Sequence, residues 1–400
     1  MAVDDTGKRH ILETYEKGKN QGVFPLQCLK AAVQDGLIRS DKYNIPRSSF
    51  QPASLDLRLG EKAYRLRCSF LPDKQSVQEK LRDFAMEEID LRDGAILERN
   101  RPYLIPLIEE LRLPQSVRGK ANPRSSTGRL DIFTRVISDH GHKFDEIRSG
   151  YNGKLYLEVL SRTFTIKVRT LESLNQLRLI TGRSRCDDHE VLDYHRKTPI
   201  LYEGGSPVPA DNLVLSNGLF LGVDLQGDQR RVVGYRAKKN SLLLDLSRLG
   251  HYEPAHFWEA VYPEEGYRIV LEPEEFYLIL SLESVRIPPQ FAAEMAAYDP
   301  TSGELRTHYA GFFDPGFGYG AGGQLKGTRA VLEVRAHDVP LILEHGQRVC
   351  KLEFENMCES PTILYGEDMG SSYQEQELTL SKHFRREWPG RAQQPPLFPS

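Results

Sequence analysis

The chain has 400 residues, of which 39% are hydrophobic and 27% are charged, and its formal net charge is −3. This length exceeds what one compact core usually holds and predicts two domains. A nearly neutral chain has no global basic field for nucleic acid, and no stretch approaches the ~18 apolar residues of a membrane span. We therefore expect neither a nucleic-acid polymer nor a membrane as partner.

The N-terminal segment and the cysteines indicate the compartment. Residues 1–20 are charged throughout and lack the apolar core of a secretory signal. The five cysteines are scattered, and none forms a C-x-x-C pair. An odd, scattered set is typical of reduced thiols, so we expect a cytoplasmic protein.

A helix is the first predicted element, over residues 25–38, where apolar side chains recur at helical spacing and Gly36 can end it. The segments that follow are short, partly alternating apolar runs, which predict strands. Examples are YLIPLIEELRLP and KLYLEVLSRTFTIKV in the first half, and EFYLILSLESVRIP and RVCKLEFENM in the second. Residues 182–212 lose this pattern and are expected to hold the connection between domains. The Pro-rich end beyond Trp388 is expected to be unpacked.

These strand-like runs belong to a diverged tandem repeat. The segment that begins at Leu97 aligns with the one that begins at Leu271, an offset of 174 residues, and one inserted proline later the offset is 175. At the second offset ISDHG matches FFDPG, and Glu158 of LYLEVL matches Glu333 of VLEVR. A constant offset over such a length indicates a duplicated β-rich unit.

The motif NPRSSTGRL, residues 122–130, has two interpretations. Its hydroxyls and turn amides beside Arg124 form a compact set of donors for a phosphate chain. The alternative is a polar β-turn, since Pro, Ser and Gly dominate turns. In the second copy the positions of Arg124, Ser125 and Arg129 hold Asp299, Pro300 and Glu304. A turn needed only for folding would keep its type in both copies, so we predict an anion site in the first copy and its scaffold in the second.

Glu158 lies in the apolar run KLYLEVL, on the face that it shares with Tyr156 and Leu160. A carboxylate in apolar surroundings is costly unless it is paired or protonated. A structural salt bridge is one interpretation, and Glu333 in the copy without the arginines favours it. The functional interpretation requires a nearby cation, for which Arg129 is the candidate, and makes the pair a general acid/base.

The tail, residues 364–386, is polar and punctuated by Gly and Ser. By composition it is a mobile segment. Its donors could also close over a bound ligand as a lid.

Four segments together resemble the dCTP deaminases, members of the dUTPase-like superfamily of trimeric β-barrel nucleotide enzymes. They are Ser49–Gly60 (SFQPASLDLRLG), Pro123–Leu130 (PRSSTGRL), Leu155–Leu160 (LYLEVL) and the tail from Tyr365 to Lys382. The segments occur in the family's order, spread over most of the chain, and are most similar to the long, duplicated form.

This resemblance implies a mainly β fold, with two tandem dUTPase-like β-barrels (distorted jelly rolls) and few short helices. The N-terminal domain would be residues 1–190, with the catalytic motifs. The C-terminal domain would be residues 191–400, with the degenerate motif and the lid segment 364–386.

The resemblance further implies hydrolytic deamination of dCTP to dUTP and ammonia. Arg124, Ser125 and Ser126 match residues that hold the triphosphate and help to orient the reacting water. Arg129 matches an arginine that assists the catalytic carboxylate. Glu158 matches the glutamate that activates water for attack on carbon 4 of cytosine.

The remaining site residues also follow from the resemblance. Asp139 matches the aspartate that contacts the deoxyribose, although no aromatic residue follows it at the usual short spacing. The residues that match the phosphate-closing lid are Tyr365, Tyr373 and Gln376. The family's lysine before the second tyrosine is Ser372 here, so Lys382 is expected to replace it.

Cofactors, assembly and rival functions complete the expectations. Zinc deaminases use H-x-E and P-C-x-x-C ligands, which this chain lacks, so no protein-bound metal is expected. Mg²⁺ is expected on the substrate triphosphate. The superfamily favours a homo-oligomer, in particular a trimer. The rivals are a dUTP diphosphatase, a bifunctional dCTP deaminase/dUTP diphosphatase, a non-catalytic nucleotide-binding regulator and a structural module.

Overall fold

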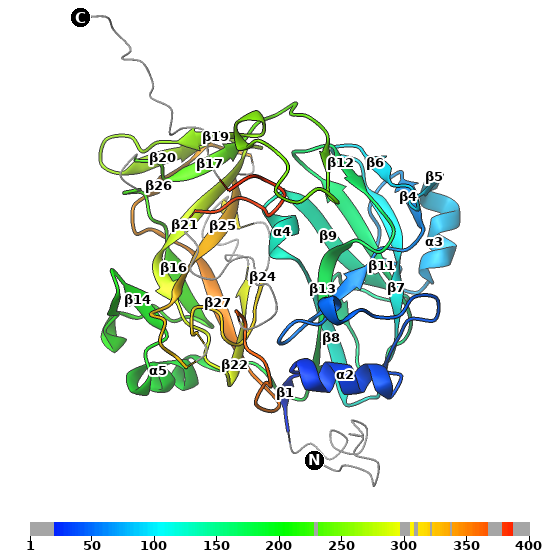
Figure 1. Ribbon diagram of the computed structural model, residues 1–400, viewed down its shortest axis with the longest axis horizontal. Coiled ribbons are helices and arrows are strands. Elements are labelled where there is room, and N and C mark those ends of the chain that lie inside the picture. The colour runs from blue at the N-terminus through cyan, green and yellow to red at the C-terminus, as the bar shows by residue number, and fades with distance from the viewer. Residues whose placement is uncertain are drawn as a thin grey trace, which may run out of the picture.

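The computed structural model describes residues 20–227, 231–296, 305–307, 311–320, 322–336, 338–366 and 378–386. Two β-rich halves lie side by side, with α4 (Ser125–Gly128) close to the junction between them (Figure 1). Within these residues the chain forms four α-helices, and most other regular structure is strand. The predicted class, tandem mainly β domains with few helices, is confirmed. Of the helices in the described ranges, none combines the length and apolar character of a membrane span.

The first half opens with a short strand and the predicted helix, which is present as α2 (Leu26–Gln34). Its face toward the sheets buries Leu26, Leu29 and Ala32. The strands and helices of this half are β1 (Gly22–Val23), α2, β2 (Ile38–Arg39), β3 (Leu55–Arg58), β4 (Lys62–Leu66), α3 (Val77–Phe84), β5 (Ala85–Asp90), β6 (Ala95–Leu97), β7 (Tyr103–Arg112), β8 (Val117–Pro123), α4, β9 (Ile132–Ser138), β10 (Glu146–Ile147), β11 (Asn152–Ser161), β12 (Ile166–Val168) and β13 (Ser173–Thr181).

Two sheets enclose the core of this half. One has the order β1-β13-β8-β10, with β3 also on β13, and the other has the order β5-β4-β7-β11-β9, with β2 also on β7. Alternation along β11 places Leu155, Leu157 and Val159 in the main core. Tyr156 packs on the opposite face in a smaller cluster with residues of β4 and α3. Glu158 is therefore also directed to that opposite face.

The second half repeats this plan. Its elements are α5 (Asp188–Lys197), β14 (Leu201–Glu203), β15 (Ser206–Pro207), β16 (Leu219–Gly222), β17 (Gly234–Ala237), β18 (Leu244–Asp245), β19 (Trp258–Val261), β20 (Arg268–Leu271), β21 (Phe276–Val285), β22 (Phe291–Ala296), β23 (Leu305–Thr307), β24 (Gly311–Phe313), β25 (Thr328–Ala336), β26 (Leu341–Glu344) and β27 (Arg348–Asn356). Strands β7 and β11 of the first half correspond to β21 and β25, which pair antiparallel at the same relative register.

Residues 182–212, in which the apolar strand pattern is lost, nevertheless contain regular structure. They contain α5, β14 and β15, and α5 occupies the place in the second half that α2 has in the first. The helix begins with a capping box, in which Asp187 accepts from the Glu190 N–H and Glu190 accepts from the Asp187 N–H. The predicted domain boundary at 190/191 falls inside α5, so we propose that the division lies in the preceding segment, 182–187.

The junction between the halves is a continuous apolar core. Trp258 and Phe384 pack in the same cluster as Leu157 and Phe164 of the first half, with the Phe164 and Trp258 rings 5.6 Å apart. Strand β18 of the second half pairs in parallel with β12 of the first. The fully buried guanidinium of Arg178, on β13, donates to the backbone oxygens of Ala293 and Phe313 at 2.9 Å each. The two halves therefore form one folded unit.

Candidate active site between the two halves

The motif at residues 122–130 forms a short helical turn rather than a hairpin turn. Helix α4 connects β8 to β9, and the N–H groups of Thr127 and Gly128 donate to the Arg124 carbonyl at 2.8 and 3.0 Å. Ser126 is buried, whereas Ser125 is exposed and keeps its hydroxyl at the surface of the turn. The motif thus presents one hydroxyl and one guanidinium on its outer side.

Arg124 and Lys382 lie on one cavity of about 180 Å³, which Ser126 also lines. Lys382 comes from the tail, so the structure brings together three of the residues predicted for phosphate binding. Burial lowers the pKa of Lys382 to about 8, and the Arg124 guanidinium adds to the decrease, while Asp56 and Glu172 oppose it. Two neighbouring cations in a small cavity are arranged to receive an anion.

Asp56 holds the Arg124 guanidinium in place, with Arg124 Nη1 2.9 Å from Asp56 Oδ2. Burial raises the pKa of Asp56 to about 6, although Arg124 and Lys382 both oppose the rise. The sequence contained a signal for this residue, because Asp56 lies in SLDLRLG, one of the segments that carry the family resemblance. Sequence reasoning gave it no role.

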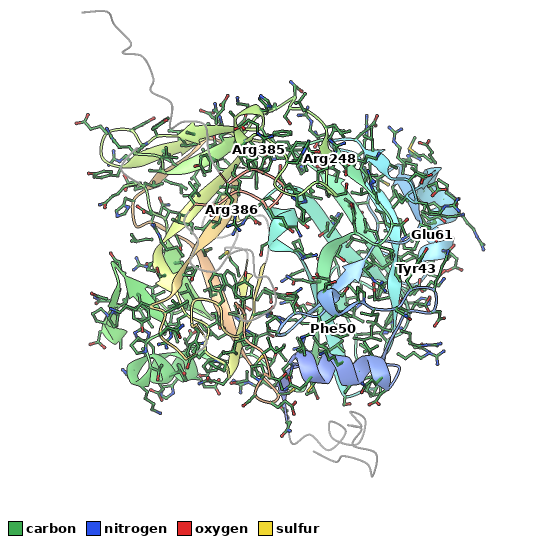
Figure 2. All side chains as sticks on the ribbon, in the orientation of Figure 1. Tyr43, Phe50, Glu61, Arg248, Arg385 and Arg386 are labelled. Carbon is green, nitrogen blue, oxygen red and sulfur yellow. The ribbon has the colours of Figure 1, made fainter. Side chains whose placement is uncertain are left out.

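Exposed arginines extend the positive charge around this cavity. Arg248 is next to Ser247 and Leu249, which line the cavity, and Arg385 and Arg386 follow Lys382 by three and four residues. Figure 2 shows Arg248, Arg385 and Arg386 on the side of the junction where the tail runs. A local basic field of this kind attracts anions although the whole chain is slightly acidic.

The tail crosses α4 within the same chain. Ser381 Oγ donates to the Ser126 carbonyl at 2.8 Å, and Arg129 Nη1 donates to the Thr379 carbonyl at 2.8 Å. Tyr365 is half-buried and its ring lies 5.6 Å from that of Phe317. The other two predicted lid residues, Tyr373 and Gln376, lie outside the described residues.

The carboxylate beside the motif is Glu333, on β25 of the second half. A Cβ added to Gly128 would stand only 2.2 Å from Glu333 Oε2, so the carboxyl end of this half-buried side chain packs against the α4 backbone. Glycine at position 128 is thus required by the close approach of the carboxyl group.

Glu333 is surrounded by groups that set its protonation. Loss of water contact raises the pKa of its carboxyl to about 8; the Asp131 carboxylate adds to the rise, and the Arg129 guanidinium opposes it. Arg129 and Asp131 are themselves buried. A carboxyl group with a pKa near neutrality, beside a cation and an exposed hydroxyl, has the properties of a general acid/base.

The predicted pairing of Arg129 with Glu158 is wrong. Glu158 is buried and pairs instead with Arg135, whose Nε donates to Glu158 Oε1 at 3.0 Å. Arg135 also donates to Ser69 Oγ at 2.9 Å and stacks over Phe144, 3.9 Å from the ring centre. The reason is alternation along β11, which directs Glu158 to the face that the segment before α3 covers. Glu158 therefore has the structural ion pair that was its alternative interpretation.

Asp139 is likewise engaged away from the motif. Its Oδ1 accepts from the Val77 N–H at 2.7 Å, at the first turn of α3. Its counterpart in the second copy, Asp314, pairs with Arg178 at 3.2 Å and is close enough to raise the pKa of Asp56. The sequence contained a signal that Asp314, rather than Asp139, lies near the site. An aromatic residue, Phe317, follows Asp314 at short spacing.

The site is thus composite, with Arg124, Arg129 and the hydroxyls from the first copy, and Glu333 and the tail that carries Lys382 from the second. The fold and this arrangement define a duplicated, mainly β protein whose candidate site lies between its two halves. The chain belongs to the 2′-deoxycytidine 5′-triphosphate deaminase (DCD) family. The model of the family's N-terminal domain matches residues 20–183 and that of its C-terminal domain matches residues 187–384.

Individual relatives agree with this assignment. A crystal structure of 2′-deoxycytidine 5′-triphosphate deaminase from Agrobacterium tumefaciens superposes with a TM-score of 0.79 at 42% identity, over 85% of this chain and all of that one. The dCTP deaminase, dUMP-forming, of Methanothermobacter thermautotrophicus is 26% identical over 33% of this chain and 64% of its own length. That of Methanobrevibacter smithii is 31% identical over 28% of this chain and 55% of its own length. The chain thus spans under two thirds of these curated relatives.

Proposed function

We propose that this protein hydrolyses dCTP to dUTP and ammonia at the composite site, with Glu333 as its general acid/base. The observation that carries the proposal is the contact of the Glu333 carboxyl with α4, beside Arg129 and the exposed Ser125. Family membership supports dCTP as the substrate.

The site residues divide into two groups in this proposal. Arg124, Lys382 and Ser126 bind the triphosphate, whose negative charge would keep Lys382 ionised despite its lowered pKa. Mg²⁺ would arrive bound to the triphosphate, because the nearby Asp56 is already paired with Arg124. Within the described residues, no group of three or more His, Cys, Asp or Glu side chains is placed to hold a metal ion.

The reaction requires one proton to be accepted and one to be donated. Water, held by the Ser125 hydroxyl, gives a proton to the Glu333 carboxylate as its oxygen attacks carbon 4 of cytosine. The same carboxyl then donates a proton to the amine, the carbon–nitrogen bond breaks and ammonia leaves. With a pKa of about 8, Glu333 is ionised in roughly one molecule in ten at pH 7, so both forms are available.

The duplication offers a matched pair of variants for testing this assignment. Glu333→Gln should lower kcat for ammonia release by ~10²–10⁴-fold while dCTP binding, measured by calorimetry, is retained. Glu158→Gln changes the equivalent residue of the other copy and should retain turnover, with some loss of stability from its ion pair with Arg135. Loss of turnover in a folded Glu158→Gln variant, with activity kept in Glu333→Gln, would reverse the assignment.

A second candidate is a bifunctional enzyme that converts dCTP to dUMP, because the curated relatives are named as dUMP-forming. Assay of both ammonia and pyrophosphate from dCTP separates the two. Equal yields of both products support the bifunctional enzyme, and ammonia alone supports the simple deaminase.

A further inference from the structure

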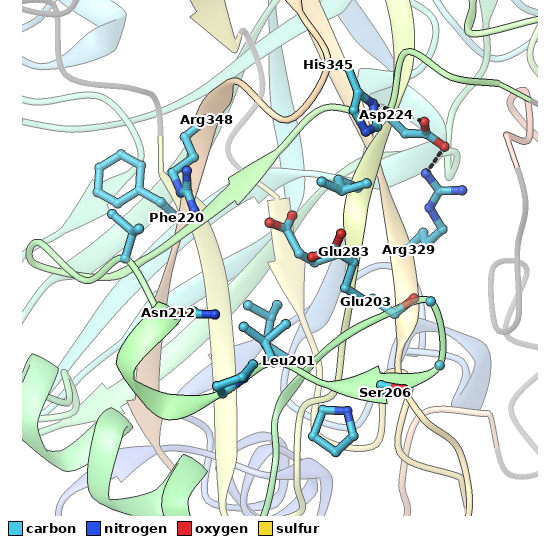
Figure 3. Close-up of a pocket in the computed structure, with 18 of the residues that line it drawn as sticks. Leu201, Glu203, Ser206, Asn212, Phe220, Asp224, Glu283, Arg329, His345 and Arg348 are labelled. Atoms are coloured by element: carbon cyan, nitrogen blue, oxygen red, sulfur yellow. Dashed lines mark hydrogen bonds and ion pairs between the residues drawn. The ribbon is translucent and has the colours of Figure 1, made fainter.

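A second, larger cleft lies at the outer edge of the second half and shares no lining residue with the composite site. Its volume is about 1040 Å³, and it lies between the β14–β15 hairpin and strands β16 and β21. We call it the β14 cleft. Figure 3 shows Glu283 in its middle, between the segment with Leu201 and Ser206 and the side chains of Arg348 and Asp224.

The repeat shows what normally fills this position. In the first half, Glu109 Oε2 accepts from the Arg58 N–H at 2.8 Å. In the second half, Glu283 Oε2 accepts from the Gly222 N–H at the same distance. Each donor ends the corresponding strand, β3 or β16, and each glutamate lies at the corresponding position of β7 or β21. The carboxylate and its backbone donor are therefore present in both copies.

At the end of this strand, an arginine is present only in the first copy, whereas in the second copy Arg348 lies on the neighbouring strand as the partner of Gly222. In the first copy the Arg58 side chain is buried, and its Nε donates to Glu109 Oε1 at 2.6 Å. Its Nη1 and Nη2 donate to carbonyl oxygens after β2, those of Asn44 at 2.8 Å and Tyr43 at 3.1 Å. The second copy has glycine at this position, and the β14 cleft opens where the arginine side chain lies in the first copy.

Glu283 is thus a largely buried carboxylate that, in the described residues, lacks the ion pair of its counterpart. The residue is only 7% exposed, and in the described part of the chain the one hydrogen bond to its carboxylate is that from the Gly222 N–H. A buried carboxylate is costly unless a positive group accompanies it. A bound cation would remove this cost.

The other charged groups of the cleft are largely engaged with one another. Asp224 pairs with Arg329, and His345 Nδ1 accepts from the Leu225 N–H at 3.1 Å. Arg348 lines the cleft, but no ion pair joins it to Glu283 in the described residues. Arg348, the cross-strand partner of Gly222, and Glu203 are exposed, so Glu283 is the largely buried charged group of the cleft that has no ion pair in the described residues.

We propose that the β14 cleft is a binding site for an alkyl guanidinium group, which pairs with Glu283 as Arg58 pairs with Glu109. The group belongs either to a free small molecule or to an arginine side chain of a second copy of this chain. The site is independent of the proposed deaminase activity.

Agmatine, an alkyl guanidinium, is a suitable probe for calorimetric titration of the full-length protein. We expect saturable binding that weakens at least tenfold in Glu283→Gln. The matched control is Glu203→Gln, which removes an exposed carboxylate from the same cleft and should change the affinity less than threefold. Ser206→Trp, on the exposed β14–β15 hairpin, narrows the cleft without changing Glu283 and should also weaken agmatine binding. This variant keeps the proposal testable if Glu283→Gln does not fold.

Sedimentation velocity with and without agmatine distinguishes the two sources of the group. Agmatine-induced dissociation that Glu283→Gln reproduces without agmatine would assign the group to a second copy. Saturable binding at constant mass would assign it to a free ligand. The proposal is overturned if agmatine binding and assembly are both insensitive to Glu283→Gln and Ser206→Trp, or if inorganic phosphate binds the cleft in place of agmatine.

Discussion

The Gly128→Ala substitution tests the geometry of the composite site most directly. The added methyl group would stand 2.2 Å from Glu333 Oε2 and 2.7 Å from its Cδ. Unstrained contacts of this kind need roughly 3.5 Å, so the carboxyl group must retreat by about 1 Å. Misplacement of a catalytic group by about 1 Å can cost ~10²-fold in rate. Arg124 and Lys382 are not displaced, so substrate binding should change little.

We therefore expect Gly128→Ala to lower kcat for ammonia release by about 10²-fold, with KM for dCTP within a few-fold of the original. Overpacking should also lower the free energy of unfolding by about 1–3 kcal/mol, measured by urea denaturation. Gly322→Ala is the matched control, because a Cβ there meets only the Gln324 side chain at an ordinary 3.7 Å. Unchanged kcat in a folded Gly128→Ala protein would refute the placement of Glu333 against α4.

Two further predictions concern charge. Because the pKa of Glu333 in the folded protein, about 8, exceeds its ordinary value of 4.5, its contribution to stability is complete below pH 4.5 and is lost as pH rises through about 8. The unfolding free energy of the original protein minus that of Glu333→Gln, from urea titrations, should decline across this range, and a constant difference would contradict the raised pKa. Lys382→Met should raise KM for dCTP by roughly 10–100-fold with kcat nearly unchanged, as expected for loss of a charged phosphate contact. Steady-state kinetics would contradict this if kcat fell while KM stayed constant.

The sequence was sufficient to predict helix α2, the repeat of strand-like segments and the place of the motif at residues 122–130 between two strands. Those features depend on local spacing and on comparison of the two copies along the chain. Which carboxyl group lies beside the motif depends on which surfaces of the two copies meet. The offset of 175 residues between the copies does not indicate which surfaces these are. Glu158 and Glu333 are equivalent in sequence, yet only Glu333 lies against α4.

Helices α5 and α3 were not predicted, although capping residues in the sequence mark the start of both. Helix α5 was missed because only Val191 and His195 among its residues are buried, which leaves a weak apolar pattern. The two residues of its capping box, Asp187 and Glu190, could nevertheless be recognised in the sequence by their spacing. A capping box at Ser76 and Glu79 likewise begins α3. This helix belongs to the segment that covers the face of the sheet with Glu158.

The fold explains why Glu333, and not its counterpart Glu158, lies beside the motif of the first copy. In the first copy, α3 and its neighbouring strands cover the face that holds Glu158, and Arg135 neutralises it there. In the second copy, the equivalent face meets α4, so Glu333 lies against the motif of the first copy. The described part of the site is thus assembled within a single chain. Association into the expected trimer is therefore not needed to bring Arg129 and Glu333 together, and its role would lie elsewhere, for example in covering the β14 cleft.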